Sequence, residues 1–421
     1  MPRYHYTLTT RKPMSAGAAD ARGNTRRAHQ IIPGGTIRGA LAAAWWRGPG
    51  ATSSAASDDF ATLFDTQLLV GQAVPDDFEL VSASATICKY RSQPECATVV
   101  QERGHPDRPH QWGECWSCGG PLVASPGWRR RPGPAAHLVS RTRGALTPQE
   151  TAAEGQLFSR QAVAGTAGAP LRLSGLIDAP AGALDWLGGT SLRVGGGRSV
   201  DLGSCSVDMA AADPPPLPEG EKLLFHLISP GIILDRFGGA DLSMAALRAE
   251  LQRVAQQPEL EITGSPRWLR SESVTGWHMR SRLPKPHDWA LAAGSAAVVT
   301  GLSEDGWVRL QRGIGYRTLE GFGQVALRGP AELPDEPTNA GIAALNQLRD
   351  AVPKLSQWQK IRHDLLSVLK QLQAADPAKA ELLRTTTTFP GLMGEQQGKA
   401  TAVLRIPVGH IPGTITKLGG M

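Results

Sequence analysis

The chain has 421 residues, of which 41% are hydrophobic, and it carries a formal net charge of +6 with an isoelectric point near 9.2. This length suits two or more globular domains, and the composition excludes a fibrous or disordered chain. A run of eighteen apolar residues is absent and the first residues lack the apolar core of a secretory signal, so we expect a cytoplasmic protein without membrane contact.

A strand and a basic loop open the chain. Tyr4–Thr10 alternates apolar and polar residues, which predicts a strand. The loop that follows is rich in arginine, including Arg26 and Arg27, and its one acid is Asp20. Arginine suits a phosphate backbone because its planar fork pairs with two oxygens. A coding preference for arginine would produce the same enrichment, so the composition by itself leaves both interpretations open.

The stretch from Ile31 to Trp46 predicts a helix with an anion site at its start. Gly34 and Gly35 follow a proline, and the apolar residues then recur at helical spacing. Thr36 is the predicted N-cap, since its hydroxyl can accept a bond from an amide of the first turn. Arg38 lies where the helix dipole disfavours a cation unless an anion is bound. The alternative is a plain corner between a loop and a helix.

Cysteines gather in an insertion at residues 88–140, after a strand candidate at Phe78–Ile87. Cys115 and Cys118 have the CxxCG form of a zinc knuckle, and Cys88 and Cys96 would complete a four-sulfur site. Such a site would be structural, because four thiolates leave no open position on the metal. The alternative is a set of reactive or incidental thiols.

Two further stretches are rich in glycine. The first contains Gly196 and Arg198 and ends in a strand at 204–207. The second, at 311–325, places paired glycines on both sides of a five-residue tip. Glycine clusters let backbone amides approach a phosphate chain without a Cβ in the way. The residues of this second stretch that we expect to contact such a phosphate chain are Arg312, Gly313, Gly315, Arg317, Gly321 and Gly323.

The remaining patterns place the domain boundaries. Arg141 and Arg143 precede a passage that contains Leu157 and Phe158 and ends in a strand at 171–177. We therefore expect an N-terminal domain at 1–210, a proline linker at 211–220, a second domain at 221–335 and a helical extension with a tail at 336–421. Helical spacing is strong at 242–256 and at 341–374, where a proline splits the pattern, and 401–406 is a possible late strand.

Four of these stretches resemble the RAMP superfamily of CRISPR proteins, in the form found in type III effector subunits. They are residues 33–41, 141–177, 192–207 and 311–325. Gly35-Thr36 stands where the family usually has Gly-Ser, and Cys205 replaces a glycine of the first loop. The resemblance implies an α+β fold with two tandem ferredoxin-like βαββαβ domains, here with a zinc-knuckle-like insertion and a helical C-terminal extension.

The resemblance is greatest to the type III-D, Cas five-like member. It implies a non-catalytic subunit that binds the 5′ handle region of crRNA and docks the large Cas ten-type subunit and backbone RAMP subunits, with target RNA nearby. The residues that we expect to contact RNA, besides those at 312–323, are Arg26, Arg27, Gly34, Gly35, Thr36, Arg38, Gly196 and Arg198.

Two enzymatic alternatives and one structural alternative stay open at this point. His29 could act as a general base on a 2′-hydroxyl in crRNA processing. Asp20 could support cleavage of target RNA. A zinc-dependent scaffold without RNA contact would also fit, if the basic residues were scattered over the surface.

Overall fold

The computed structural model describes the chain except for residues 18–23, 91–99, 106–114, 116–120, 132–136, 167–168, 198–201, 279–280, 282, 331–339, 353–354, 391, 393, 407–410, 412–413, 416–417 and 419–421. The chain divides into two compact units. The first consists of Met1–Ser84 and Pro126–Glu332, and the second of Ala85–Ser125 and Leu333–Met421. Helices and strands are mixed, as the α+β prediction requires. Within the described ranges, we find no helix with the length and apolarity that a bilayer span needs.

The first sheet of the first unit has the strand order of a ferredoxin-like βαββαβ unit. Its central strands are neighbours in the order β14-β1-β12-β3, and each pair is antiparallel. Four antiparallel strands connected in this order are what two β-α-β halves produce. The strands of this sheet are β1 (Arg3–Thr10), β3 (Leu69–Val70), β4 (Val74–Pro75), β12 (Arg172–Asp178), β13 (Ser191–Arg193) and β14 (Ser204–Ala212).

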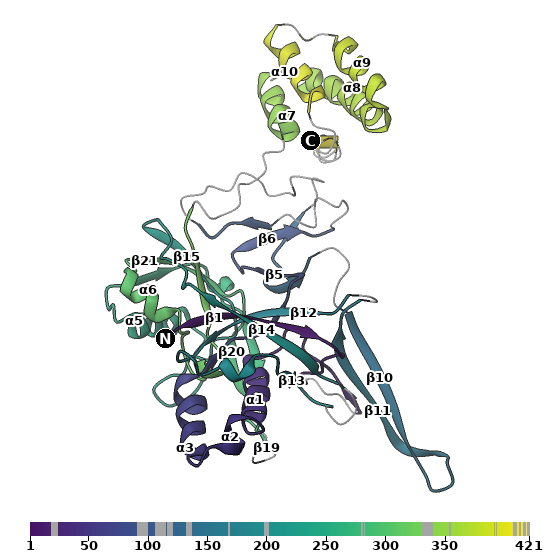
Figure 1. Cartoon of the computed structure of the whole chain (residues 1–421). Coiled ribbons are helices and arrows are strands. Elements are labelled where there is room, and N and C mark those ends of the chain that lie inside the picture. Colours follow the sequence, from purple (N-terminus) through teal and green to yellow (C-terminus); the bar gives the residue numbers. More distant parts are fainter. Residues whose placement is uncertain are drawn as a thin grey trace. The chain divides into compact units, whose positions relative to one another are not determined.

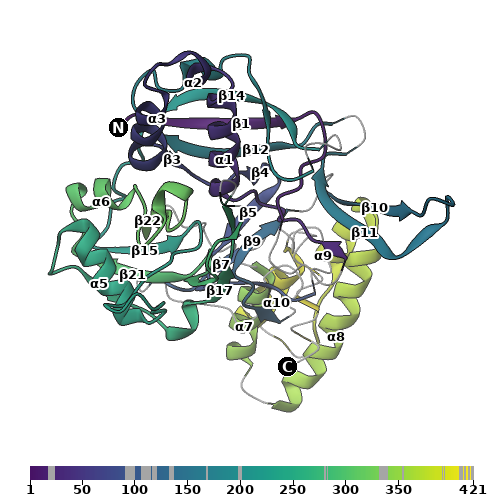
Figure 2. The same ribbon diagram turned by 90° about the horizontal axis from the view of Figure 1, so that it is seen from below.

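The two crossover connections of this sheet differ in their helix content. Helix α1 (Gly34–Trp45) lies along one face of the sheet, as Figure 2 shows, and buries Ile37, Leu41 and Trp45 in its core. It is followed by α2 (Pro49–Thr52), α3 (Ala56–Phe60) and the π-helix η1 (Ala61–Gln67). Between β12 and β14 the described residues form only the short 3-10 turn η2 (Asp185–Leu187) and the edge strand β13. The second crossover helix is therefore reduced to one turn.

A long hairpin leaves the connection between β3 and β12. Strands β10 (His137–Leu146) and β11 (Ala152–Ala164) pair antiparallel, and β2 (Thr25–Arg26) adds to β11 in parallel. Figure 1 shows the two long strands projecting from the body of the first unit. The same connection holds β5 (Phe78–Val81), which pairs with β9 (Gly127–Arg130). The predicted strand at 78–87 is therefore two strands, since β6 (Ala85–Cys88) belongs to another sheet.

The second sheet of the first unit is a complete βαββαβ arrangement. Its strand order is β16-β21-β15-β22, again antiparallel throughout. The elements follow as β15 (Lys222–Leu227), α5 (Met244–Ala255), β16 (Glu261–Thr263), β21 (Ala296–Thr300), α6 (Glu304–Leu310), the 3-10 turn η5 (Thr318–Glu320) and β22 (Val325–Arg328). The proline segment before β15 packs on this sheet, because the indole of Trp307 donates to the carbonyl oxygen of Pro215 at 2.8 Å.

Between β16 and β21 the chain forms the 3-10 turn η4 (Pro266–Trp268) and a second hairpin. This hairpin contains β17 (Ser271–Val274), β18 (Trp277–His278), β19 (Leu283–Pro284) and β20 (Asp288–Leu291). β17 pairs with β20, and β18 with β19.

The second unit contains a small sheet and a set of helices. Strand β6 pairs with β7 (Val100–Glu102) and β8 (Leu122–Val123). The helices are α7 (Ala340–Ala351), α8 (Leu355–Ala374), α9 (Pro377–Thr386) and α10 (Glu395–Leu404), and they share a core with Trp358 fully buried. The predicted late strand at 401–406 is wrong. Ala400, Val403 and Leu404 lie on one face of α10 at helical spacing, and that face is buried.

A buried histidine makes the second sheet sensitive to acid. Burial, together with the nearby Arg328, lowers the pKa of His226 to about 3, and its Nδ1 has no hydrogen-bond partner in the described structure. The unfolded chain therefore takes up this proton first as the pH falls below about 6.5. We expect His226 to remove about 2 kcal/mol of folding free energy between pH 7 and pH 5. Urea unfolding at both pH values measures this.

The control is His226→Leu, which keeps the apolar volume of the side chain and cannot titrate. The difference between the two proteins isolates this one group from the carboxylates, which titrate in both. An identical pH dependence in wild type and His226→Leu would contradict the assignment.

Candidate RNA interface

The start of α1 differs from its prediction. The helix begins at Gly34 with Pro33 as the N-cap, and no side chain caps it. The prediction that Thr36 is the N-cap is wrong, because Thr36 lies inside the first turn and donates its backbone N–H to the Pro33 carbonyl at 2.9 Å. A proline has no N–H to satisfy, which makes it a tolerable residue at a helix start.

The two glycine motifs at opposite ends of the first unit meet at this helix start. A Cβ on Gly34 would collide with the backbone oxygens of Val70 and Glu320, and one on Gly321 would collide with that of Val70. Gly321 also has a φ of +83°, which favours glycine. The start of α1, the end of β3 and turn η5 are therefore in direct backbone contact. The glycines at 34 and 321 serve this close packing.

An internal carboxylate occupies the region where we expected a phosphate. A Cβ on Gly35 would lie 2.7 Å from Oε2 of Glu320. Lys285 donates to that same oxygen at 2.7 Å, and Arg317 donates to it at 3.0 Å. Burial opposes ionisation of Glu320, but these hydrogen bonds outweigh it and lower its pKa. The negative charge that complements the α1 dipole comes from the protein itself.

Arg317 is engaged within the protein and is not directed at an external phosphate. Its side chain is 9% exposed, it pairs with Asp288 at 3.1 Å and with Glu320, and its guanidinium lies over the ring of Phe322 at 4.7 Å. Close backbone packing also accounts for the other glycines of this loop. A Cβ on Gly315 would collide with the Ile232 backbone, and one on Gly323 with that of residue 314.

The other predicted cations of these motifs are more accessible. Arg312 is exposed, and its guanidinium lies 3.6 Å from the sulfur of Met1. Arg38 pairs with Asp65 at 3.5 Å, and Asp65 is itself 65% exposed. A pair of this kind is weak in water and leaves Arg38 able to exchange partners.

Several arginines lie on the β10–β11 hairpin and the adjacent strand β2. Register places Arg141 on β10 opposite Arg160 on β11, and Arg160 opposite Arg26 on β2. Residues directly opposite each other across paired strands point to the same face of a sheet. Three guanidinium groups thus stand in one row across three strands, and we call Arg26, Arg141 and Arg160 the arginine row. Arg143, two residues from Arg141, lies on the same face.

Like charges in one row repel and need an anion nearby. Burial lowers the pKa of Arg160, and the neighbouring guanidinium groups of Arg26 and Arg143 lower it further. Among the residues that the structure describes, no carboxylate forms an ion pair with Arg26, Arg141 or Arg160. Within the described ranges, the fold therefore accepts repulsion here without a counter-charge, unlike the site at Glu320.

An aromatic ring accompanies the arginine row. Phe158 stands opposite Arg143 and two residues from Arg160, so it shares their face, and it is 50% exposed. Leu157, on the other face, is 61% exposed. Gly196 lies beside the row, since a Cβ there would be 3.8 Å from Nη1 of Arg160. Cations interleaved with an exposed ring are the pattern of single-stranded nucleic-acid surfaces.

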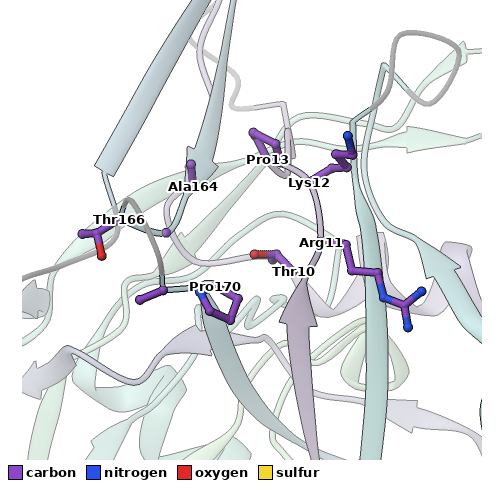
Figure 3. A pocket seen from close by; sticks show the side chains of 9 residues that line it. Thr10, Arg11, Lys12, Pro13, Ala164, Thr166 and Pro170 are labelled. Carbon is purple, nitrogen blue, oxygen red and sulfur yellow. The ribbon is translucent and has the colours of Figure 1, made fainter.

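A cleft of about 320 Å³ lies at the base of this hairpin (Figure 3). Its walls are the end of β1 with the following residues, 10–13, and the segment between β11 and β12, residues 164–166 and 169–170. Arg11 and Lys12 stand on one wall, and the hydroxyls of Thr10 and Thr166 on the two sides. The cleft is open to solvent, and the side chains of Arg11 and Lys12 point away from the opposite wall, as Figure 3 shows.

The catalytic and metal candidates are only partly placed. Asp20, Arg198, Cys96 and Cys118 lie outside the described residues. Arg27 and His29 are both exposed, and the backbone N–H of His29 donates to Ala16 at 2.8 Å.

The structure brings two of the predicted zinc ligands together. Cys88 and Cys115 are both buried and pack in one small cluster with Leu122. Within the described ranges no group of three or more potential metal-ligating residues forms.

Similarity to solved structures is weak. The chain resembles one in the cryo-EM structure of the type III-B Cmr-beta bound to cognate target RNA, at 12% identity and a TM-score of 0.38, covering 70% of this chain and 86% of that one. It also resembles a RAMP protein binding different RNA substrates, at 11% identity, TM-score 0.33 and coverage of 78% and 99%. The product of a Cas6-related gene from Pyrococcus furiosus is similar at 10% identity, TM-score 0.32 and coverage of 80% and 99%.

No protein-family model matches the sequence, and no curated protein matches it. Because each TM-score is below 0.5, the role of the chain has to be inferred from its own strand order and side chains. The arginine row is the main basis for that inference. Of its members, Arg26 was a predicted RNA contact, and Arg141 and Arg160 were not. The register that aligns the three is not visible in the sequence.

Two of the three glycines of α1, Gly34 and Gly39, provide a matched test of the contact between α1 and η5. We expect Gly34→Ala to lower the free energy of unfolding by about 2–3 kcal/mol, because its Cβ would force backbone atoms apart. Gly39→Ala, five residues further along the same helix, meets nothing within 4 Å and should raise it by about 0.5–1 kcal/mol. Urea unfolding compares the two, and equal effects would show that the contact is absent.

Proposed function

We propose that this chain is a non-catalytic, RNA-binding subunit of a type III CRISPR ribonucleoprotein. The arginine row carries the proposal. Three arginines held side by side with no acid of the described residues paired to them, next to an exposed aromatic ring, suit a single RNA strand. Each guanidinium can pair with two phosphate oxygens, and the binding of a strand would relieve the repulsion that the row creates.

The fold supports the same proposal. Two sheets with the antiparallel order of βαββαβ units follow each other in the chain, in keeping with two ferredoxin-like RAMP domains. The four sequence stretches that resemble the RAMP superfamily fall at the start of α1, along β10–β12, at β13–β14 and around η5. Under this proposal the glycine motifs at α1 and η5 hold the two domains together, and the RNA lies on the hairpin side.

The finer assignment rests on the resemblance to type III-D, Cas five-like proteins. The ligand that we propose is crRNA, bound near its 5′ handle. The partners that we propose are the large Cas ten-type subunit and the backbone RAMP subunits. A non-catalytic role fits a surface that grips phosphates with arginine and places no described acid beside them.

Salt dependence tests the arginine row. We expect Arg141→Gln and Arg160→Gln each to weaken binding of a labelled single-stranded RNA about five- to tenfold, and to reduce the slope of log K against log salt by about 0.7. Fluorescence anisotropy across a salt series measures both quantities. The melting temperature should not fall, because each substitution removes a like-charge contact.

The control is Arg253→Gln on α5, where the arginine is exposed and pairs with Glu250. This variant should bind RNA as the wild type does. If the arginine-row variants bind with unchanged affinity and slope, or if the wild-type chain cuts the RNA, the proposed function is wrong.

We propose also that the cysteines of the insertion hold a structural zinc ion. Cys88 and Cys115 are 27 positions apart yet buried in one cluster, which suits half of a tetrahedral sulfur site, and Cys96 and Cys118 would supply the other half. Zinc bound to all four would tie a segment with few apolar residues into one structure.

Metal analysis of the purified chain tests this site. We expect about one zinc ion per chain, and its loss from Cys88→Ser and Cys115→Ser. Cys205→Ser is the matched control, since that thiol is buried in the core of the first sheet and burial raises its pKa to about 12. A wild-type chain without zinc, or a Cys205→Ser chain that loses it, would contradict the proposal.

A further inference from the structure

The second βαββαβ unit carries its own hairpin at the same topological position as β10–β11. In the first unit the hairpin leaves the connection between the second and third core strands, β3 and β12. In the second unit, β17–β20 and β18–β19 leave the connection between β16 and β21. The proposed function assigns no role to this second hairpin, and its surface differs from that of the first.

Exposed indole rings distinguish the second hairpin. Trp277 on β18 is 57% exposed and Trp289 on β20 is 52% exposed. Val274 on β17 and Ala290, which follows Trp289 on β20, are buried in a small core with Ile232. The register pairs Trp289 with Ser273 and Asp288 with Val274, so Trp289 points away from that core.

The hairpin is held rigidly at its base. Lys285 pairs with Glu320, and Asp288 pairs with the buried Arg317, so two ion pairs join the hairpin to turn η5. His287 bonds to the Ser273 hydroxyl at 2.9 Å and lies edge-on to Trp289 at 6.1 Å between ring centroids. Rings held in place lose little conformational entropy when a ligand stacks on them.

Charge distinguishes a nucleic-acid partner from an apolar protein surface. Residues 264–291 contain five basic and two acidic residues. Asp288 is neutralised by Arg317 and Lys285 by Glu320, and Glu272 is largely buried, which raises its pKa. Arg267 and Arg270 are exposed, and they are the described arginines that give this segment its positive charge. Exposed indoles in a basic environment suit unpaired nucleobases, whose faces stack on the rings while the phosphates stay near the cations.

We propose that the hairpin at 271–291 is a second RNA contact, on which unpaired bases stack against Trp277 and Trp289. This inference rests on the proposed function and deepens it. The first hairpin would bind phosphates through the arginine row, and the second would bind bases through its indoles. One consequence is that the affinity contributed by the first hairpin depends on salt concentration. The affinity contributed by the second hairpin depends on the presence of bases in the strand.

An abasic RNA separates these two contributions. We would measure anisotropy with a labelled oligouridine and with the same strand carrying abasic nucleotides, using the full-length chain. We expect Trp277→Ala and Trp289→Ala each to weaken binding of oligouridine about tenfold and to leave binding of the abasic strand unchanged. The salt slope should stay at its wild-type value, in contrast to the arginine-row variants.

Two further variants keep the test specific. Trp277→Phe and Trp289→Phe retain a stacking face and should recover most of the affinity. Phe237→Ala removes a ring that is 82% exposed on the loop after β15 and should have no effect. Thermal melting of each variant establishes that it is folded.

The outcomes are distinct. A wild-type chain that binds neither strand overturns the proposed function and this inference together. A chain that binds RNA with the same affinity after both tryptophan substitutions overturns the inference alone. The inference alone is also overturned if the tryptophan variants lose as much affinity for the abasic strand as for oligouridine. The same holds if these variants lose a protein partner while their RNA affinity stays intact.

Discussion

The start of α1 packs directly on turn η5, and this contact joins the two sheets of the first unit. Backbone oxygens of Val70 and Glu320 approach Gly34 so closely that no side chain fits between them. Other polar contacts reinforce the joint. Arg3 on β1 pairs with Asp178 at 2.7 Å and donates to the Gln311 carbonyl at 2.9 Å, and the indole of Trp128 donates to Ile228 at 2.9 Å. The two hairpins therefore project from one fixed body.

The position of Glu320 explains why the contact between α1 and η5 is not also the main site for an external anion. A helix N-terminus attracts negative charge, and the nearest carboxylate of the chain already lies there with Arg317 and Lys285 as its partners. An incoming phosphate would have to displace a carboxylate that holds two cations. The arginine row presents the opposite situation, because its charges have no described internal partner and the repulsion among them is left for a ligand to relieve.

The hairpins of the two sheets carry different types of side chain, and each type suits a different part of a nucleic-acid strand. Guanidinium groups on β10, β11 and β2 suit the phosphates of a strand whatever its sequence. Indole rings on the second hairpin suit bases, again with little sequence preference, because every base has a stacking face. Under the two proposals, a strand would be recognised by its backbone at the first hairpin and by its unpaired bases at the second.

The sequence alone was enough to predict much of the local structure. The alternation in β1, the helical spacing in α1, α5, α7 and α8, and the α+β class are all recovered in the structure. These features depend on neighbours within one strand or helix, so the chain order reveals them. The late strand at 401–406 failed because a short apolar run suits either state, and burial against α7 and α8 selected the helix.

Tertiary structure decided the site. The row formed by Arg26, Arg141 and Arg160 exists only through the register of β10, β11 and β2, which no spacing along the chain reveals. The groups that approach Gly34, Gly321 and Arg317 come from residues far away in the sequence, so the spacing of these motifs could not reveal them. Pairing between strands and the identity of distant neighbours are long-range properties. The sequence alone therefore determined which residues were unusual, and only the folded chain determined which of them face outward.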